Sequence, residues 1–373
     1  MRFSFRHTRS PFVLALSAIL PLGVVAPAAS AWDAIGHRAI TWLALDGLDP
    51  AMPGFLKEKN NVHAIGWEAA EPDRWRNIKQ PVYLAHENGP DHYLDVEDLG
   101  RFGLTLETVP ALRMKFIAVM AVQRHEHPRG PDDNLEPYNA KLDPSGQQEW
   151  PGFVLHAMVE HHAKLVSTFK TYRTLEKLTD PARGPQVEMT KANIMVEMGV
   201  LAHFVGDTAQ PLHTTKHHHG WVGDNPKGYT VDRGFHAYID GGVLNLHKLD
   251  YHSLKPGQTY TTKVEADAWD DVVAHLKRSN DKVVELYELQ KSGDLQKDAG
   301  KAFIIERLHD GAAMLSALYN HAWKMSEPTE QDIKDFIRYD GFTPGQLPSA
   351  AAADGKRGDE KAAGQDAVSP AAR

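Results

Sequence analysis

The sequence from position 201 to position 213 reads Leu201-Ala202-His203-Phe204-Val205-Gly206-Asp207-Thr208-Ala209-Gln210-Pro211-Leu212-His213. It completes a stretch from Glu188 to Thr208 in which apolar side chains recur every three or four residues, and this spacing predicts a helix. His203 and Asp207 are four residues apart, so on a helix both side chains point the same way. Pro211 should end the helix. His213 then follows on the turn, free to face the same cavity.

The same helical spacing recurs along most of the chain. Strand-like alternation is scarce, and no repeat of solenoid length is visible. The sequence therefore predicts a single, mainly helical, all-α domain over residues 32–343. The other segments with this spacing are Ile35 to Leu45, Thr108 to Arg124, Phe153 to Leu178, Ala266 to Leu289 and Ala302 to Met325.

Residues 1–31 are typical of a secretory signal peptide. A basic start precedes an apolar run from Phe12 to Val25, and the small residues Ala29-Ser30-Ala31 form the expected cleavage site. Pro21 and Gly23 interrupt the run, which is too short for a comfortable membrane span. We therefore expect an exported protein, periplasmic or secreted, with no stable membrane anchor.

Two other stretches predict little regular structure. Residues 126–151 are polar and rich in Pro, Gly, Asp and Asn, which is typical of a long surface loop. Residues 344–373 contain almost no large apolar side chains and cannot bury enough surface to offset the entropy of ordering. We expect the latter to be a disordered tail.

The composition limits the chemistry. The 373 residues include no cysteine, so disulfides and thiolate metal sites are excluded, whereas 21 histidines are available as ligands. The formal net charge of -8 argues against a protein that coats long nucleic acid through a basic surface. The same net charge is compatible with an enzyme that binds a few phosphates through metal ions.

A second histidine–aspartate pair stands at His236 and Asp240, again four residues apart. One such pair is usually a chance occurrence or a surface hydrogen bond. Two pairs flanking His213, in a chain without thiols, favour a metal site, because zinc takes imidazole and carboxylate ligands when cysteine is absent.

The start of the mature chain offers another pair of donors. Cleavage after Ala31 makes Trp32 the first residue, and His37 follows five positions later. A free α-amino group beside a histidine can chelate a metal. The plainer alternative is that Trp32 only anchors the N-terminus in the core.

Upstream, two short motifs add acidic, basic and aromatic residues. Pro72 suits the first turn of a helix, which would place Asp73 and Arg76 on one face. The second motif runs from Asp91 to Asp95 and contains His92 and Tyr93. Taken singly, Asp73 also fits a helix N-terminal carboxylate, and the His92–Tyr93 pair also fits ordinary half-buried packing.

Together these motifs resemble the zinc-dependent single-strand nucleases and 3′-nucleotidases of fungi, plants and bacteria, whose fold the bacterial zinc phospholipases C share. The resemblance covers residues 32–325. It rests on an N-terminal Trp followed by Gly-His, an Asp with Arg three residues on, His-aromatic-x-Asp, Gly-Asp…Gln-Pro-Leu-His and His-x-x-x-Asp. In this chain these are Trp32 with Gly36-His37, Asp73 with Arg76, His92 to Asp95, Gly206 to His213, and His236 with Asp240.

The resemblance implies three zinc ions and a phosphodiester hydrolase. Its ligands would be Asp73, His92, His203 and Asp207 for the first zinc, the Trp32 amine and carbonyl, His37 and Asp207 for the second, and His213, His236 and Asp240 for the third. It implies a catalytic role for Asp73 and Arg76, with Arg76 stabilising charge on the phosphoryl oxygens. Tyr93 would stack on a base, and Asp95 would accept hydrogen bonds from it. The implied substrates are single-stranded DNA or RNA, and 3′-nucleotides.

Some features depart from the family pattern. Asn245-Leu246-His247 resembles the family's last motif, but Asp250 is only three residues beyond His247, so the pair His236 and Asp240 is preferred. The interval from His92 to His203 is long, which suggests a remodelled cleft. His217-His218-His219 is expected to be a solvated loop, although contact with substrate or an extra metal is an alternative.

Two other functions remain open at this stage. A zinc phospholipase C would use nearly the same ligands to cleave phospholipid head groups, but its family usually ends the site with glutamate where this chain has Asp240. A non-catalytic zinc-binding protein would not need Arg76 beside Asp73.

Overall fold

The computed structural model describes residues 32–77, 82–126, 141, 143–255, 263–264 and 267–341. The predicted signal peptide over residues 1–31, the predicted tail over residues 344–373 and most of the predicted loop over residues 126–151 lie outside these ranges. Helices dominate, and the described residues contain no β-strand. The fold is therefore the single, mainly helical body that the sequence predicts.

The predicted helical segments correspond to helices in the structure. α1 spans Ala34–Asp46 and ends at Gly47, α6 spans Val154–Leu178, α7 spans Gly184–Ala209 and α13 spans Asp298–Met325. α7 stops before Pro211, as expected, and a 3-10 turn, η7 (Pro211–Thr214), carries His213.

Two predicted helices have different limits. α5 begins at Arg113 and runs to Glu126, later than the expected start at Thr108, because Thr108 closes a capping box with Thr105 in the 3-10 turn η4 (Leu106–Thr108). The expected helix from Ala266 to Leu289 is two helices, α11 (Ala268–Asn280) and α12 (Val283–Ser292). No Gly or Pro stands at this break, and apolar residues keep their helical spacing across it. The sequence therefore gives no sign of the break.

Shorter elements complete the described chain. The helical ones are α2 (Lys59–Glu68), α3 (Glu71–Asn77), α4 (Val82–Asn88), α8 (Phe235–Ala237), α9 (Val243–His247), α10 (Tyr251–Leu254) and α14 (Glu330–Asp340). The tighter turns are η1 (Gly54–Lys57), η2 (Gly89–His92), η3 (Val96–Phe102), η5 (Gln147–Glu149) and η6 (Pro181–Arg183), and a π-helical turn, η8, covers Tyr238–Gly242.

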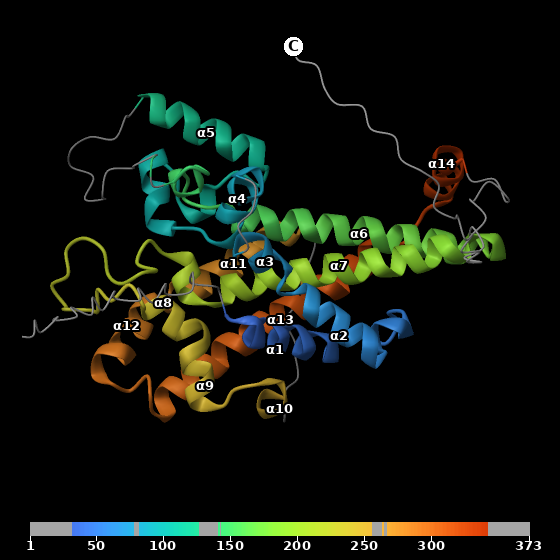
Figure 1. Ribbon diagram of the computed structural model, residues 1–373. Coiled ribbons are helices and arrows are strands. Elements are labelled where there is room, and N and C mark those ends of the chain that lie inside the picture. Colours follow the sequence, from blue (N-terminus) through green and yellow to red (C-terminus); the bar gives the residue numbers. More distant parts are fainter. Residues whose placement is uncertain are drawn as a thin grey trace, which may run out of the picture.

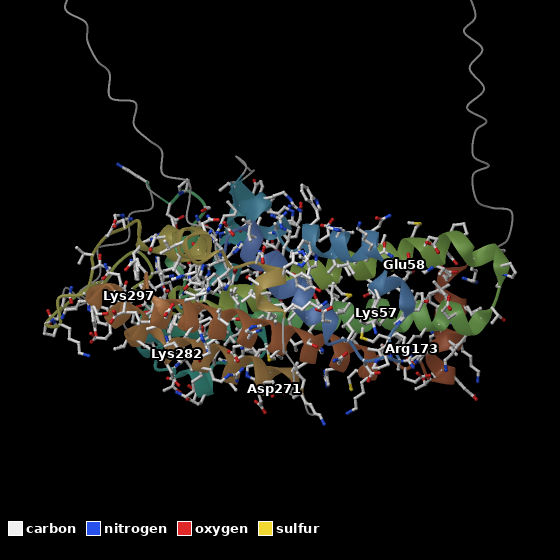
Figure 2. All side chains as sticks on the ribbon, turned by 90° about the horizontal axis from the view of Figure 1, so that it is seen from below. Lys57, Glu58, Arg173, Asp271, Lys282 and Lys297 are labelled. Atoms are coloured by element: carbon white, nitrogen blue, oxygen red, sulfur yellow. The ribbon has the colours of Figure 1, made fainter. Side chains whose placement is uncertain are left out.

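The long helices form the centre of the molecule. α6 and α7 lie side by side along the body, and α13 packs against both (Figure 1). α1 packs against α7 and α13, and α2 lies beside α1 and α7. Their facing side chains form one continuous apolar core that includes Ile40, Phe169, Phe204 and Leu315. Charged side chains such as Lys57, Arg173 and Lys297 lie on the outside (Figure 2).

No helix among the described residues is both long enough and apolar enough to span a lipid bilayer.

Candidate metal centre

The C-terminal half of α7 brings two ligand side chains into the core. From Met198 to Ala209 every residue of this helix is buried, because it packs against α1, α6 and α13. His203 and Asp207 lie one turn apart, and His203 Nε2 is 3.4 Å from Asp207 Oδ2. Both side chains have no exposed surface. The residues that interrupt the apolar pattern of α7 thus face one another inside the molecule.

The orientation of His203 suits metal binding. Its Nδ1 lies 2.9 Å from the backbone oxygen of Ala69 and donates a hydrogen bond to it. The Nε2 lone pair therefore points into the cluster, where it lies 2.9 Å from His92 Nδ1. A carbonyl that fixes the tautomer of a ligand histidine is a common second-layer arrangement at metal sites.

A first ligand group joins His203 with Asp73 and His92. Asp73 comes from α3 and His92 from the end of η2, so the group draws on three separate elements. His203 Nε2 is 4.0 Å from Asp73 Oδ1, and His92 Nδ1 is 3.1 Å from Asp207 Oδ2. The other ring nitrogen of His92 lies 3.1 Å from the Asn88 amide, which also bonds the oxygen of Pro72.

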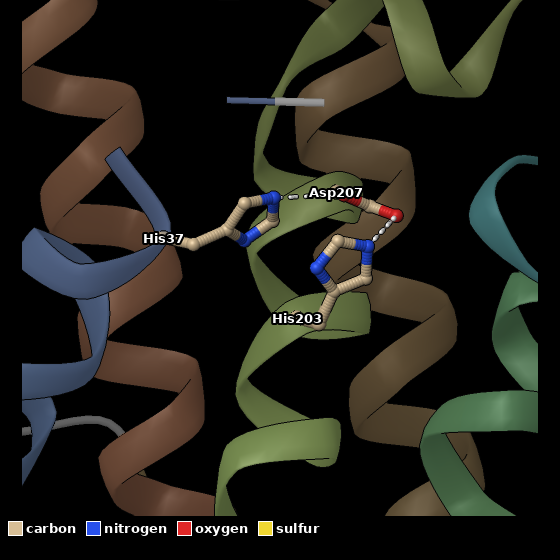
Figure 3. Close-up of side chains that lie close together, drawn as sticks. All are labelled: His37, His203 and Asp207. Atoms are coloured by element: carbon tan, nitrogen blue, oxygen red, sulfur yellow. Dashed lines mark ion pairs between the residues drawn. The ribbon is translucent and has the colours of Figure 1, made fainter. Parts of the chain in front are cut away.

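A second group joins His37 from α1 with His203 and Asp207 (Figure 3). The His37 ring stacks on that of His203 with their centroids 4.2 Å apart, and His37 Nε2 is 3.4 Å from Asp207 Oδ1. The two oxygens of Asp207 therefore face different groups, Oδ1 toward His37 and Oδ2 toward His92 and His203. This is the geometry of a carboxylate that bridges two cations.

Trp32 precedes α1, the helix that carries His37. Its side chain is completely buried, and a Cβ added to Gly36 would approach Trp32 Cβ to 2.7 Å, so glycine allows the close packing of the chain start on α1. The next residue, Asp33, caps α1 and donates its backbone N–H to the oxygen of Asp240. The structure thus holds Trp32 against α1, while ligation by its amine and carbonyl stays a prediction.

The third group contains His213, His236 and Asp240. His213 donates from Nδ1 to the oxygen of His92 at 2.6 Å, so its Nε2 is directed at His236 Nε2, 2.9 Å away. His236 Nε2 is 3.6 Å from Asp240 Oδ2. Gln210 orients the carboxylate by donating to Asp240 Oδ1 at 2.8 Å.

The segment that carries His236 and Asp240 is not a regular α-helix. It changes from α8 to the π-helical turn η8 between the two residues. Single π-helical turns are frequent at functional sites. The four-residue spacing nevertheless keeps both side chains in one group.

Burial shifts the pKa values of most histidines and aspartates in the three groups so that their uncharged forms are favoured. Burial lowers the pKa of His92, His203 and His236 well below the usual range and lowers that of His213 to about 3, so all four imidazoles are neutral near pH 7. Burial raises the pKa of Asp207 and Asp240 well above the usual range. A bound cation would offset this cost, because it favours the ionised carboxylates.

The donor set fits a divalent metal ion. Among the described residues, Asp207 Oδ1 and Asp240 Oδ2 are buried and accept no hydrogen bond, and each faces a histidine nitrogen. In each group the ligand atoms lie within 4.8 Å of one another. Imidazole and carboxylate donors without thiolate suit zinc and also other divalent transition metals.

The predicted substrate residues lie next to the first and third groups. Arg76 NH2 is 2.8 Å from Asp73 Oδ1, one turn along α3. Tyr93 follows His92 directly and is half-buried, and its hydroxyl donates to the oxygen of Gln147 at 2.9 Å. Asp95 Oδ1 is 3.7 Å from His218 Nδ1.

The triple-histidine segment differs from the expected solvated loop. His217 is buried and stacks on Trp221 at 3.9 Å, so Trp221 also serves in packing. Burial lowers and Asp95 raises the pKa of His218, and the net effect is an increase. The His219 ring lies 5.4 Å from that of His236. The expectation was wrong because aromatic packing against Trp221 draws the segment onto the site, and the run of histidines was the only signal for it.

Three other histidines make contacts outside the three ligand groups. His247 Nε2 bonds the oxygen of Leu295, 2.9 Å away, so Asn245-Leu246-His247 is separate from the third group. His161 pairs with Glu197 at 2.8 Å, and His162 stacks on His321. Asn88 and the Ala69 carbonyl, which orient His92 and His203, carried no recognisable sequence signal.

Comparison with protein-family models and with curated proteins finds no match to this chain.

Proposed function

We propose that this chain is a zinc-dependent phosphodiesterase that hydrolyses single-stranded nucleic acid, and 3′-nucleotides as smaller substrates. The observation that carries the proposal is the position of Asp207, whose two oxygens face two different ligand groups while the third group lies alongside. The resemblance of the ordered motifs to zinc nucleases supports the same conclusion.

The described residues suggest how three metal positions would be held. Asp73, His92, His203 and Asp207 would hold the first zinc, His37 and Asp207 with the Trp32 amine and carbonyl the second, and His213, His236 and Asp240 the third. Zinc supplies Lewis acidity at such a site, by polarising phosphoryl oxygens and lowering the pKa of bound water to about 7.

The remaining residues would bind and orient the substrate. Arg76 presents a guanidinium that matches phosphoryl oxygens, and its contact with Asp73 orients it in advance. Tyr93 offers a ring next to His92 on which an unstacked base can lie, and Asp95 offers a hydrogen-bond acceptor. A stacking contact that accepts any base favours single strands, in which bases are free to leave the stack.

The test is a substrate panel with the zinc-loaded protein beginning at Trp32. Single-stranded DNA, RNA and 3′-nucleotides should be cleaved, and Arg76→Ala should lower turnover by about 10²–10³ while leaving the zinc content unchanged. The matched control is Arg74→Ala, since Arg74 lies on the same helix but pairs with Glu71. Cleavage of phosphatidylcholine alone would reassign the chain to the phospholipases C, and no cleavage of any substrate would favour a non-catalytic zinc protein.

A further inference from the structure

His219 lies beside the third ligand group and has no role in the function proposed above. Its ring centroid is 5.4 Å from that of His236, with the ring planes tilted by 51°. Its Nδ1 is buried and makes no hydrogen bond to any part of the chain that the structure describes. A covered imidazole nitrogen without a hydrogen bond, next to a candidate metal position, calls for an explanation.

The ring spacing is that of imidazoles which share one metal. With Zn–N distances of about 2.0–2.1 Å and tetrahedral angles, two such rings have centroids roughly 5 Å apart. The pair His213 and His236, which belongs to the third group, has a centroid distance of 4.7 Å. His219 lies at a similar spacing from His236, with the ring centroids 5.4 Å apart.

The third group also has room for a ligand. It offers three protein ligands, His213, His236 and Asp240, whereas tetrahedral zinc takes four. His219 is not among the residues whose ligand atoms lie within 4.8 Å of one another, so ligation by His219 requires its side chain to turn toward the group.

The backbone on both sides of His219 is well held, which limits the movement to the side chain. His217 stacks on Trp221 and accepts the backbone N–H of Val222 at 3.0 Å. Gly220 has φ +92, and a Cβ there would lie 2.6 Å from the backbone of Val231. Only glycine tolerates this close approach, so the segment is fixed at its end.

We propose that His219 is a fourth, exchangeable ligand of the metal ion held by His213, His236 and Asp240. The proposal rests on the zinc centre proposed above. His219 completes the coordination while no substrate is present, and an oxygen of the substrate displaces it. His219 would thereby slow the loss of the third metal and give up its coordination position when substrate binds.

The experiment measures metal affinity in the mature protein after removal of metal by a chelator. Zn²⁺ or Co²⁺ is titrated against a competing coloured chelator, and the visible spectrum of the Co²⁺ form reports the ligand set. His219→Ala should weaken one binding equivalent by about tenfold or more, change the Co²⁺ spectrum, and leave the other equivalents unaltered. Added imidazole should restore both properties, which it would not do for a purely structural defect.

Two controls separate the possible outcomes. His218→Ala alters the same segment at a ring that faces Asp95 and should leave metal affinity unchanged. His236→Ala should remove the equivalent that His219→Ala weakens. Wild-type protein that binds neither metal would refute the zinc centre itself. Full binding by the wild type, with identical affinity and spectrum in His219→Ala, would refute only the role of His219.

Discussion

Asp207 is the residue whose replacement should have the largest effect. It contacts His37 through one oxygen and His92 and His203 through the other, and it has no exposed surface. Asp207→Asn keeps the shape but removes the charge, so the first and second metal positions should both be lost or strongly weakened while the third persists. Metal analysis of the purified variant checks this. Asp310→Asn, at a half-buried carboxylate that pairs with His275 and Arg278, should retain the full metal content.

Tyr93 should affect substrate binding without affecting metal. Tyr93→Ala removes a stacking surface and no ligand, so binding of a single-stranded oligonucleotide should weaken by about 1–3 kcal/mol at constant zinc content. Tyr93→Phe keeps the ring and loses only the hydrogen bond to the Gln147 oxygen, so its affinity should stay close to that of the wild type. Equal affinity in all three proteins would show that the ring does not bind a base.

At the scale of elements, the segment that leads into α1 carries a separate prediction. Before cleavage the Trp32 nitrogen is a planar amide without a usable lone pair. A protein with one glycine added before Trp32 should therefore fold, bind the second metal poorly and lose activity by orders of magnitude. Trp32→Phe at the mature N-terminus retains the amine and should keep its metal. Equal zinc content and equal rates in the extended and mature proteins would rule out ligation by the amine.

The contact between α6 and α5 predicts acid sensitivity. His156 on α6 stacks on Phe116 of α5 and donates from Nε2 to the Pro110 oxygen. Burial lowers the pKa of His156 from 6.5 to about 4. The unfolded chain therefore binds this proton more readily between these values, so the free energy of unfolding falls as pH falls from about 6.5 toward 4.

Denaturant titration at a series of pH values tests that effect. The His156→Gln variant keeps a donor for Pro110 and should have a shallower loss of stability with acid than the wild type. His125→Gln, at an exposed position of α5, should follow the wild-type profile. Both comparisons are made against the wild type, so the loss of metal at low pH is common to all three proteins. Parallel profiles for His156→Gln and the wild type would contradict the prediction.

Across the whole molecule, local sequence signals predicted the long helices and the third ligand group well. The spacing of apolar residues in α6 and the end of α7 before Pro211 depend on residues close in the sequence, so the sequence alone predicts both. The sequence did not predict the break between α11 and α12, because the residues there carry no helix-breaking signal and tertiary packing sets the boundary. The position of His219 depends on packing between His217 and Trp221 and on the backbone of Val231 near Gly220, contacts that no local spacing encodes.

We propose that the buried histidines and aspartates around Asp207 hold three metal ions. The most direct measurement is crystallographic: an anomalous difference map of the mature protein, with data collected on both sides of the zinc absorption edge. We expect separate zinc peaks among Asp73, His92 and His203, between His37 and Asp207, and among His213, His236 and Asp240. A map of zinc-loaded crystals without peaks at these groups would contradict it.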